Sequence, residues 1–285
     1  MPFAQLFPSP ADMKHLLKLE SLPRADFDEI LRDTAVFKRE RGRHSQQPLA
    51  GQTWALMFSK QSTRTRLSFE VGIRELGGMP MFLSALDIQL GRGEPIKDTA
   101  RVMGRMVHGA VIRTFAQQDV EEFAKYSGIP TLNALTDDEH PCQILADIFT
   151  FQERRGSIEG KTVAFIGDGA CNVANSWIWA AAKFNFALRI AAPKKFQPAA
   201  SLLRRAGGNI SVTEDIQAAA RGADFDPARS DVDLLIDLEP GRSLFDLARL
   251  QRKLEELLTV RVDVVSSRGL RDQVRETVLR DALPL

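Results

Sequence analysis

The stretch that decides the fold reads T-W-A-L-M-F at residues 53–58 and S-K-Q-S-T-R-T-R-L-S-F-E at residues 59–70. The first part is typical of a buried β-strand, and an apolar helical pattern begins in the second part at Leu67. Between them, residues 62–66 hold three hydroxyls and two guanidinium groups in five positions. A strand, a polar turn and a helix in this order are typical of a parallel α/β unit.

This polar turn is a candidate anion-binding site. A helix N-terminus offers free backbone N–H groups and the positive end of the helix dipole, and both favour phosphate. Hydroxyls add donors, and the planar forks of arginine match phosphate oxygens. The alternative is a capped helix that begins with an exposed basic turn. The turn by itself does not distinguish these two interpretations.

Strands and helices alternate through the rest of the chain. Further strands are expected at residues 81–86, 110–114, 162–166, 188–192, 210–212, 232–236 and 260–265. Helices are expected at residues 11–19, 24–39, 67–76, 96–106, 119–127, 140–151, 174–184, 198–206, 216–220, 244–258 and 270–283. This pattern predicts an α/β protein with two doubly wound, parallel-sheet domains.

Length and composition fit a globular protein of this size class. The chain has 285 residues, 44% hydrophobic and 26% charged, and roughly 100–200 residues per domain suggests two domains. The net charge of +1 gives no reason to expect nucleic acid or a membrane surface as a partner. No apolar run approaches the roughly 20 residues that span a bilayer, and residues 1–10 do not resemble a signal peptide.

Cysteines and histidines give little reason to expect special chemistry. Cys142 and Cys171 do not make a disulfide framework, which favours a reducing cytoplasm. The four histidines are scattered, so no metal site is expected. The turn Gly167-Asp168-Gly169 follows a strand, but Asn172 breaks the G-x-G-x-x-G spacing of dinucleotide-binding proteins. We therefore expect no nicotinamide, flavin or other cofactor.

Five separate segments share one resemblance. They read S-T-R-T-R-L-S-F-E at 62–70, Q-L-G-R-G-E-P-I-K-D-T-A-R at 89–101, V-I-R-T at 111–114, H-P-C-Q-I-L-A-D at 140–147 and G-D-G-A-C-N-V-A-N-S at 167–176. In this order and spacing they resemble the aspartate/ornithine carbamoyltransferases, and the second and third resemble the ornithine branch. The resemblance covers about residues 1–222. Because five motifs in register are not a chance match, the chain is identified as a member of this family.

The resemblance implies a domain plan and a biological setting. It implies a carbamoyl-phosphate-binding domain at residues 1–139, a second, acceptor-binding α/β domain at 140–265, and a C-terminal helix at 266–285 that returns to the first domain. It also implies a cytoplasmic enzyme of arginine biosynthesis that acts as a homotrimer with shared active sites. The partners would be carbamoyl phosphate and an amine, with no nucleic acid and no membrane.

The resemblance also assigns roles to individual residues. Contacts to carbamoyl phosphate would come from Ser62, Thr63, Arg64, Thr65, Gln89, Arg113, His140, Gln143 and Arg268. Four of these would also be catalytic, because they would donate hydrogen bonds to the negative charge that develops on the carbonyl oxygen: Thr65, Arg113, His140 and Gln143. Gln89 lies on a loop that in relatives reaches a neighbouring subunit's site. Asn172 and Asn175 remain as contacts to the acceptor.

Several of these residues also have a purely structural interpretation. His140 precedes Pro141 and follows acidic residues, so it is also compatible with a helix start in a salt-bridged turn. Arg113 in an apolar strand is harder to explain structurally, because a buried cation needs a partner. Arg66 is expected to brace the turn rather than to contact a ligand. Cys142 is expected to be a small buried residue on a helix.

The second half of the chain departs from the family pattern. It lacks the Asp-x-Trp-x-Ser-Met-Gly loop and the His-Cys-Leu-Pro segment of ornithine enzymes, and residues 236–242 are interpreted as a degraded counterpart of the latter. The donor half of the site is therefore complete, whereas the acceptor half is missing or rebuilt. Three hypotheses follow. The protein carbamoylates ornithine or an ornithine-like amine, or it binds carbamoyl phosphate or another small anion without turnover, or it serves as a subunit of a mixed oligomer that keeps only the fold.

Overall fold

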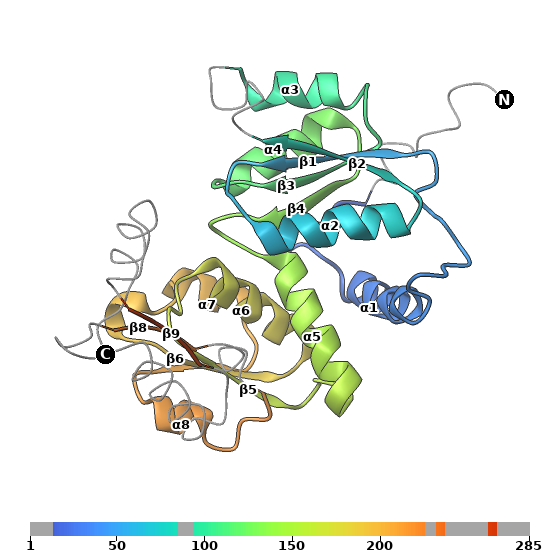
Figure 1. The fold of residues 1–285 in the computed structure, drawn as a ribbon. Coiled ribbons are helices and arrows are strands. Elements are labelled where there is room, and N and C mark those ends of the chain that lie inside the picture. Colours follow the sequence, from blue (N-terminus) through green and yellow to red (C-terminus); the bar gives the residue numbers. More distant parts are fainter. Residues whose placement is uncertain (1–13, 85–93, 226–231, 237–261, 267–285) are drawn as a thin grey trace.

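The computed structural model describes residues 14–84, 94–225, 232–236 and 262–266 (Figure 1). Two α/β domains are joined by the long helix α5 (Pro141–Arg155), which passes from the first domain to the second. The predicted fold class, two α/β domains with parallel sheets, is confirmed. Within the described ranges, no helix has the length and apolar character needed to cross a membrane.

The first domain is a parallel sheet with helices on both faces. After helix α1 (Arg24–Arg39), which packs elsewhere, its elements are β1 (Thr53–Phe58), α2 (Thr63–Glu75), β2 (Met79–Ser84), α3 (Ile96–Met103), β3 (Gly109–Arg113), α4 (Gln117–Ser127) and β4 (Thr131–Leu135). The strand order is β2-β1-β3-β4. Side chains of β1 alternate between the faces, because successive residues of a strand point to opposite sides. Ala55 and Met57 pack with α3 and α4, whereas Leu56 and Phe58 pack with α2.

The second domain contains a smaller parallel sheet. Its elements are β5 (Thr162–Ile166), α6 (Asn172–Phe184), β6 (Ala187–Ala191), α7 (Ala200–Ala206), β7 (Ile210–Thr213) and α8 (Ile216–Ala220). The strand order is β5-β6-β7. Helix α6 is apolar along most of its length and is the centre of the core, with Trp177 and Ile178 fully buried. Beyond residue 225, β8 (Val232–Ile236) and β9 (Val262–Ser266) pair in parallel as a separate two-stranded sheet.

The N-terminal part of the chain ties the two domains together. Helix α1 belongs to the first half of the sequence but packs on the core of the second domain, where Phe27 meets Phe184 edge to face at 4.9 Å. The Arg24 guanidinium donates to the carbonyl oxygen of Lys183 at 3.0 Å. The core of the second domain therefore includes α1 as well as α5 and α6, so the two domains share packing at their junction.

Two local predictions differ from the structure. A helix was expected at residues 11–19, but the described part, from residue 14, is not helical. Leu16 instead forms a parallel bridge with Leu132. Its backbone thereby hydrogen-bonds to the outer edge of β4, which pairs with no other described strand of the sheet. The helix predicted from Leu67 begins at Thr63, because Ser62 caps it. The polar S-T-R-T-R segment is thus the cap and first turn of the helix.

The remaining predictions were close or lie outside the described residues. The ranges expected for α1 and β1 are those observed, and β3, α4 and α6 begin or end within two residues of expectation. The helices expected at 244–258 and 270–283 lie outside the described residues. The division at residues 139/140 and 265/266 stays a prediction.

Candidate functional site

The first turn of α2 lies at the carboxyl end of β1, where ligands of parallel α/β sheets bind. Ser62 is extended and caps the helix, and its Oγ accepts a hydrogen bond from the Thr65 N–H at 3.2 Å. The other N–H groups of the first turn have no partner inside the helix. Thr63 and Arg64 are exposed, and no described carboxylate forms an ion pair with Arg64. The turn therefore offers open donors and a free cation.

Arg113 comes from the neighbouring strand and meets this turn. It ends β3 in register with Phe58, the last residue of β1. Its guanidinium Nη1 donates to Thr65 Oγ1 at 3.3 Å, and its Nε is buried without a partner among the described residues. Burial lowers the pKa of Arg113. A half-buried cation without a carboxylate partner is costly, so this arrangement fits a site whose partner is an anionic ligand.

His140 lies at the start of α5, close enough to Arg113 for the two charges to interact. The helix begins at Pro141, and His140 is its N-cap residue. Burial, and after it the charge of Arg113, lower the pKa of His140 to about 4, so the imidazole is neutral at pH 7. Its Nδ1 is buried and has no partner in the described part of the chain. The structural interpretation of His140 as a helix start is thus correct, and it leaves the imidazole available.

Gln143 is not brought into this group. It is exposed in the first turn of α5, and its Nε2 donates to Asp147 Oδ1 at 2.9 Å, along the same helix. Burial raises the pKa of Asp147 to about 6. The structure thus joins Ser62, Thr65 and Arg113 directly, sets His140 beside them, and turns Gln143 away. Gln89 and Arg268 lie outside the described residues.

Asn172 and Asn175, predicted as acceptor contacts, bind the chain itself. Asn172 Nδ2 donates to the carbonyl oxygen of Thr136 at 2.6 Å, and Asn175 Nδ2 donates to that of Asp138 at 3.1 Å. Both bonds join α6 of the second domain to the loop that ends at His140. Cys171 caps α6 through a weak 3.5 Å contact with the Ala174 N–H, and burial raises the pKa of its thiol. A thiol with a raised pKa is a poor nucleophile.

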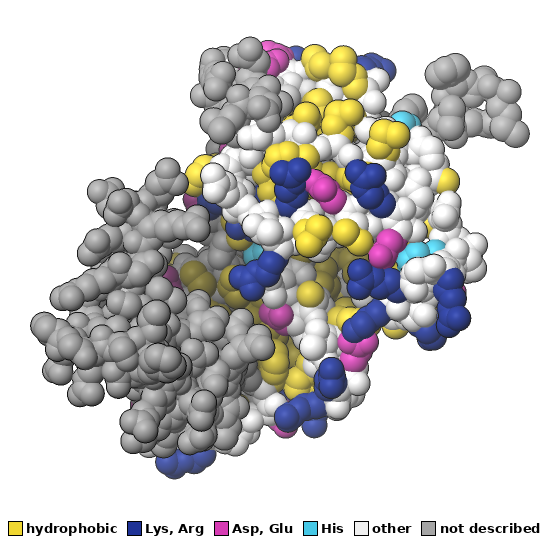
Figure 2. Space-filling model, viewed as in Figure 1, with side chains coloured by type: hydrophobic (Ala, Val, Ile, Leu, Met, Phe, Trp, Pro, Cys, Tyr) yellow, Lys and Arg dark blue, Asp and Glu magenta, His cyan; other side chains and the backbone are white. Residues whose placement is uncertain are grey.

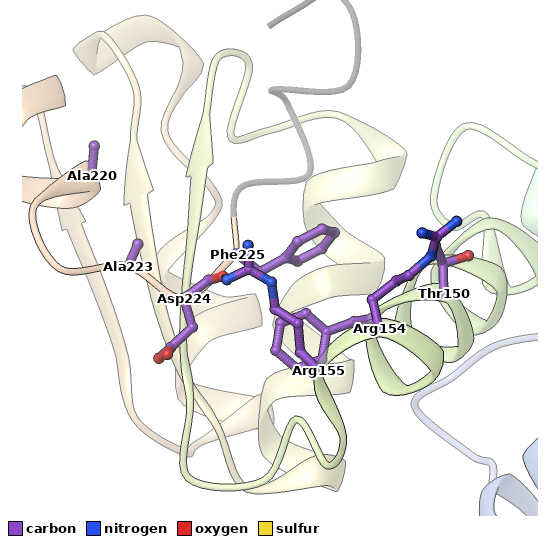
Figure 3. A pocket seen from close by; sticks show the side chains of 8 residues that line it. Thr150, Arg154, Arg155, Ala220, Ala223, Asp224 and Phe225 are labelled. Atoms are coloured by element: carbon purple, nitrogen blue, oxygen red, sulfur yellow. The ribbon is translucent and has the colours of Figure 1, made fainter. Parts of the chain in front are cut away.

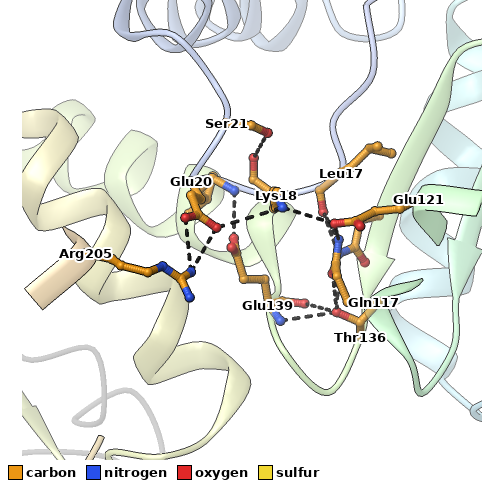
Figure 4. Close-up of polar contacts among 11 residues, drawn as sticks. Leu17, Lys18, Glu20, Ser21, Gln117, Glu121, Thr136, Glu139 and Arg205 are labelled. Carbon is orange, nitrogen blue, oxygen red and sulfur yellow. Dashed lines mark hydrogen bonds and ion pairs between the residues drawn. The ribbon is translucent and has the colours of Figure 1, made fainter. Parts of the chain in front are cut away.

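Sequence reasoning missed the role of Glu139. Glu139 is only 4% exposed, and its carboxylate accepts the N–H of Leu19 at 2.7 Å. Figure 4 shows Glu139 beside the segment that carries Lys18 and Glu20. Burial raises its pKa to about 7. Within the acidic run Asp137-Asp138-Glu139 nothing distinguishes the buried carboxylate from a solvated one. Only the fold shows that Glu139 anchors the N-terminal segment beside the site.

Other parts of the site region are structural. Arg66 forms an ion pair with Glu70 at 2.7 Å, and its guanidinium lies 3.5 Å from the centre of the Phe82 ring, so it links α2 to β2. That it contacts no ligand stays a prediction. Lys60, which precedes the capped turn, forms an ion pair with Asp137. Burial raises the pKa of Cys142 to about 12. Among the described residues, no three acidic, His or Cys side chains are grouped to hold a metal ion.

A separate pocket of about 360 Å³ lies near the other end of α5 (Figure 3). Its lining includes the aromatic ring of Phe225 and the side chains of Arg154 and Arg155, with Arg155 Nη1 donating to the Asp224 carbonyl oxygen at 3.2 Å. None of the predicted site residues lines it. We therefore assign it no part in the site around Arg113.

Family models of the carbamoyltransferases match most of the chain. Residues 14–153 match the family model of the aspartate/ornithine carbamoyltransferase carbamoyl-P binding domain, and residues 159–226 match that of the Asp/Orn binding domain. Residues 220–283 match a different model, that of a nucleotidyltransferase domain. The interpretation of residues 236–242 as a degraded His-Cys-Leu-Pro segment is therefore not supported, because that stretch lies beyond the end of the carbamoyltransferase match.

Relatives and solved structures point to the same family. The chain is 56% identical over 214 residues to ornithine carbamoyltransferase of Akkermansia muciniphila, covering 74% of this chain and 70% of the relative. It is 54% identical over 177 residues to the anabolic ornithine carbamoyltransferase of Pseudomonas aeruginosa, covering 62% of this chain and 58% of the relative. The solved ornithine carbamoyltransferase of Burkholderia thailandensis matches with a TM-score of 0.72 at 42% identity, covering 78% and 76% of the two chains.

A second solved structure, ornithine carbamoyltransferase from Pyrococcus furiosus, matches with a TM-score of 0.71 at 32% identity. The match covers 89% of this chain and 84% of the Pyrococcus furiosus chain. The chain therefore belongs to the aspartate/ornithine carbamoyltransferase family, in the ornithine branch.

Proposed function

We propose that the protein transfers the carbamoyl group of carbamoyl phosphate to the amine of ornithine or an ornithine-like acceptor. One observation carries this proposal. Arg113 contacts Thr65 at the open N-terminus of α2, and no described carboxylate neutralises Arg113 or Arg64. Such a site suits a doubly charged phosphate. The names of the relatives support the same donor and acceptor.

The geometry suggests a division of labour for the reaction. The first turn of α2 and Arg64 hold the phosphate, while Arg113, Thr65 and the neutral His140 face the carbonyl oxygen. The neutral amine attacks the carbonyl carbon, and negative charge grows on that oxygen. Preorganised donors stabilise this charge. The carbon–oxygen bond to phosphate then breaks, phosphate leaves with the electron pair, and the amine loses a proton to the leaving group or to water.

Further predicted donor contacts complete this proposal. Gln143 lies in the first turn of α5, three residues after His140, and would have to exchange its bond to Asp147 for a bond to carbamoyl phosphate. Gln89 is proposed from the resemblance alone. Arg268, which the resemblance also implies, is left out of the proposal because it lies in residues 220–283, which match a nucleotidyltransferase model. For the acceptor we propose Asn172 and Asn175, which would have to exchange their bonds to the loop carbonyls for bonds to the amino acid.

A second candidate function is donor binding without turnover. It is favoured by one finding, which is that residues 220–283 match a nucleotidyltransferase model where the family's acceptor loop and His-Cys-Leu-Pro segment are expected. Loops that close over a site exclude water and strengthen its electrostatics. If no part of this chain replaces them, carbamoyl phosphate would bind but ornithine would react slowly.

A homotrimer with shared sites is part of the proposal. Its support is an apolar surface on α2 and the edge strand β2, where Leu67, Met79 and Met81 are 59%, 62% and 45% exposed. Figure 2 shows apolar side chains between Lys and Arg side chains on the face that carries α2. Light scattering should give three times the chain mass, and Met79→Glu should shift this towards the monomer. We also propose a cytoplasmic role in arginine biosynthesis, since one relative is named anabolic.

The test of the main proposal is phosphate release with a panel of amines. With carbamoyl phosphate and ornithine, release should exceed the amine-free control and citrulline should form at the same rate. The variant His140→Asn should lose most of the rate and keep most of the donor affinity, because Arg64 and the first turn of α2 hold the phosphate. Donor binding by calorimetry without acceleration by any amine would support the second candidate. Absence of both would contradict the proposal.

A further inference from the structure

Three polar side chains on one face of α6 hold the loop between β4 and α5. Asn172, Asn175 and Ser176 are spaced i, i+3 and i+4, so they lie on the same side of the helix. Asn172 and Asn175 donate to the carbonyl oxygens of Thr136 and Asp138. The third residue, Ser176, binds the end of the loop, at His140.

Ser176 is completely buried, with 0% exposure, and uses its hydroxyl twice. Its Oγ accepts the His140 N–H at 2.8 Å and donates to the Asn172 carbonyl oxygen at 2.8 Å. The first bond crosses from the second domain to the start of α5. Many buried helical hydroxyls make only the second kind of bond, to the carbonyl four residues earlier. The bond to the His140 N–H is therefore the unusual feature of this residue.

Hydrogen bonds also hold the other end of this loop, at Thr136. Thr136 is fully buried, its Oγ1 donates to Gln117 Oε1 at 2.8 Å, and its N–H donates to the Glu139 carbonyl oxygen at 3.0 Å. The backbone from Thr136 to His140 is thus held from α4 on one side and from α6 on the other. In contrast, the His140 imidazole has a buried Nδ1 without a described partner, so its direction depends on the backbone that carries it.

We propose that Ser176 is a positioning residue for carbamoyl transfer, which sets the direction of the His140 imidazole by fixing the His140 backbone N–H. The inference rests on the proposed function. Arg113 and the first turn of α2 are held by the first domain, whereas His140 is held by a helix of the second. Ser176 therefore positions the His140 imidazole, which the second domain holds, against the carbamoyl phosphate that the first domain binds. Small misplacements of such groups lower the reaction rate strongly.

The experiment compares Ser176→Ala with a matched control, Ser127→Ala. Ser127 is also a buried helical serine whose Oγ accepts a backbone N–H, that of Ile129 at 3.4 Å, but it lies at the end of α4 away from Arg113. Ser176→Ala should lower kcat at least about tenfold and leave KM for carbamoyl phosphate within about twofold. Ser127→Ala should change neither constant, and Ser176→Thr, which keeps a hydroxyl, should recover most of kcat.

Equal kcat in Ser176→Ala and Ser127→Ala would overturn the inference, as would a loss that appears in KM alone. If Ser176→Ala does not fold, Ser176→Cys takes its place. Cysteine is a weak hydrogen-bond acceptor. The kcat of Ser176→Cys should therefore lie between that of Ser176→Thr and that of an inactive enzyme. A cysteine variant as active as the parent would overturn the inference equally.

A second readout does not depend on turnover. NMR titration of the His140 side chain, assigned by its loss in His140→Asn, should give a low pKa in the parent, where the ring is buried beside Arg113. In Ser176→Ala the freed ring should titrate closer to the ordinary histidine value of about 6.5. The same low pKa in both would overturn the inference. If the parent shows no carbamoyl transfer, the proposed function fails while this titration still decides the role of Ser176.

Discussion

The N-terminal parts of α2 and α6 occupy equivalent places, each after the first strand of a parallel sheet. Their polar side chains differ, because those of α2 include cations without a described carboxylate partner, whereas those of α6 bond to the chain itself. In α2, Arg64 stays exposed and Arg113 joins the turn without a carboxylate partner among the described residues. In α6, Asn172, Asn175 and Ser176 all bind the chain itself. The same strand–turn–helix pattern thus builds an open anion site in one domain and a closed junction in the other.

The difference lies in which groups the chain itself satisfies. Arg113 is half-buried without a carboxylate partner among the described residues, and such an unpaired charge is unfavourable until an anion compensates it. Amides and hydroxyls that find backbone partners stabilise the junction instead. The comparison teaches that a polar helix N-terminus is a candidate binding site only when its hydrogen-bond donors and cations have no partner within the folded chain.

Removal of the central cation should give the largest effect. Arg113→Met deletes a donor to the phosphate and to the carbonyl oxygen, so kcat/KM for carbamoyl phosphate should fall about a thousandfold. Arg101→Met is the control, because Arg101 pairs with Asp98 on the surface of α3. Phosphate-release kinetics measure both. A fall in kcat/KM of less than tenfold for Arg113→Met would contradict the proposed difference between the first turns of α2 and α6.

The next largest effect concerns the exposed cation of the same turn. Arg64→Met should weaken carbamoyl phosphate binding by about ten- to a hundredfold, since a charge-assisted hydrogen bond contributes about 1.5–3 kcal/mol. Arg74→Met, at the other end of α2, should leave the dissociation constant unchanged. Isothermal titration at low salt compares the two, and equal affinities in both variants would show that the turn does not select the anion.

At the junction between the domains, the next effect concerns the pH dependence of stability and not ligand binding. The pKa of Glu139 is raised from its ordinary 4.5 to about 7 in the folded protein, so folding favours the protonated carboxyl. Stability from this group is complete below pH 4.5 and is lost as pH rises to 7.

Glu139→Gln removes this dependence, so its stability relative to the parent should rise by about 2 kcal/mol between pH 5 and pH 8. The comparison with the parent cancels other groups, including His140, whose lowered pKa acts in the opposite sense because stability is lost as pH falls from 6.5 towards 4. Urea unfolding at several pH values measures the difference. A constant difference across this range would show that Glu139 is not protonated at the junction.

A smaller effect separates the two helix caps. Ser62→Ala should cost about 1 kcal/mol of stability, the usual loss for an N-cap, and should also weaken donor binding. Cys171→Ala should cost less than about 0.5 kcal/mol, because its sulfur is a weak acceptor at 3.5 Å, and should not change donor binding. Chemical unfolding with and without carbamoyl phosphate tests both, and a reversed order would contradict the comparison.

The smallest effect is expected at Arg268. The resemblance assigns it to carbamoyl phosphate, but it lies in residues 220–283, which match a nucleotidyltransferase domain. We therefore expect Arg268→Ala to change the donor dissociation constant by less than about twofold, as for a residue outside the site. Calorimetry on the variant measures it. A tenfold loss would instead support the role that the resemblance implies.

Much of the fold was predictable from local patterns. The apolar run T-W-A-L-M-F marks β1 because both faces of a parallel strand are buried, and the spacing of Phe27 and Leu31 marks α1. The bridge at Leu16 was not predictable, because it depends on the open edge of β4, which is far away in sequence.

The candidate site was predictable where a motif carries the chemistry. The resemblance placed Ser62, Thr65, Arg113 and His140 in one group, and the structure brings them together. It did not show that Asn172 and Asn175 find partners in a loop of the other domain, since hydrogen bonds between distant segments leave no local signal. Glu139 and Ser176 escaped notice for the same reason, because their partners are backbone N–H groups, which every residue type except proline supplies.

The most direct test is a calorimetric titration of the protein with carbamoyl phosphate, repeated on the double variant Arg64→Met/Arg113→Met. The account predicts one donor bound per chain by the parent, an affinity that falls with added salt, and no measurable heat from the double variant. A parent that does not bind, or a double variant that binds as tightly as the parent, would contradict it.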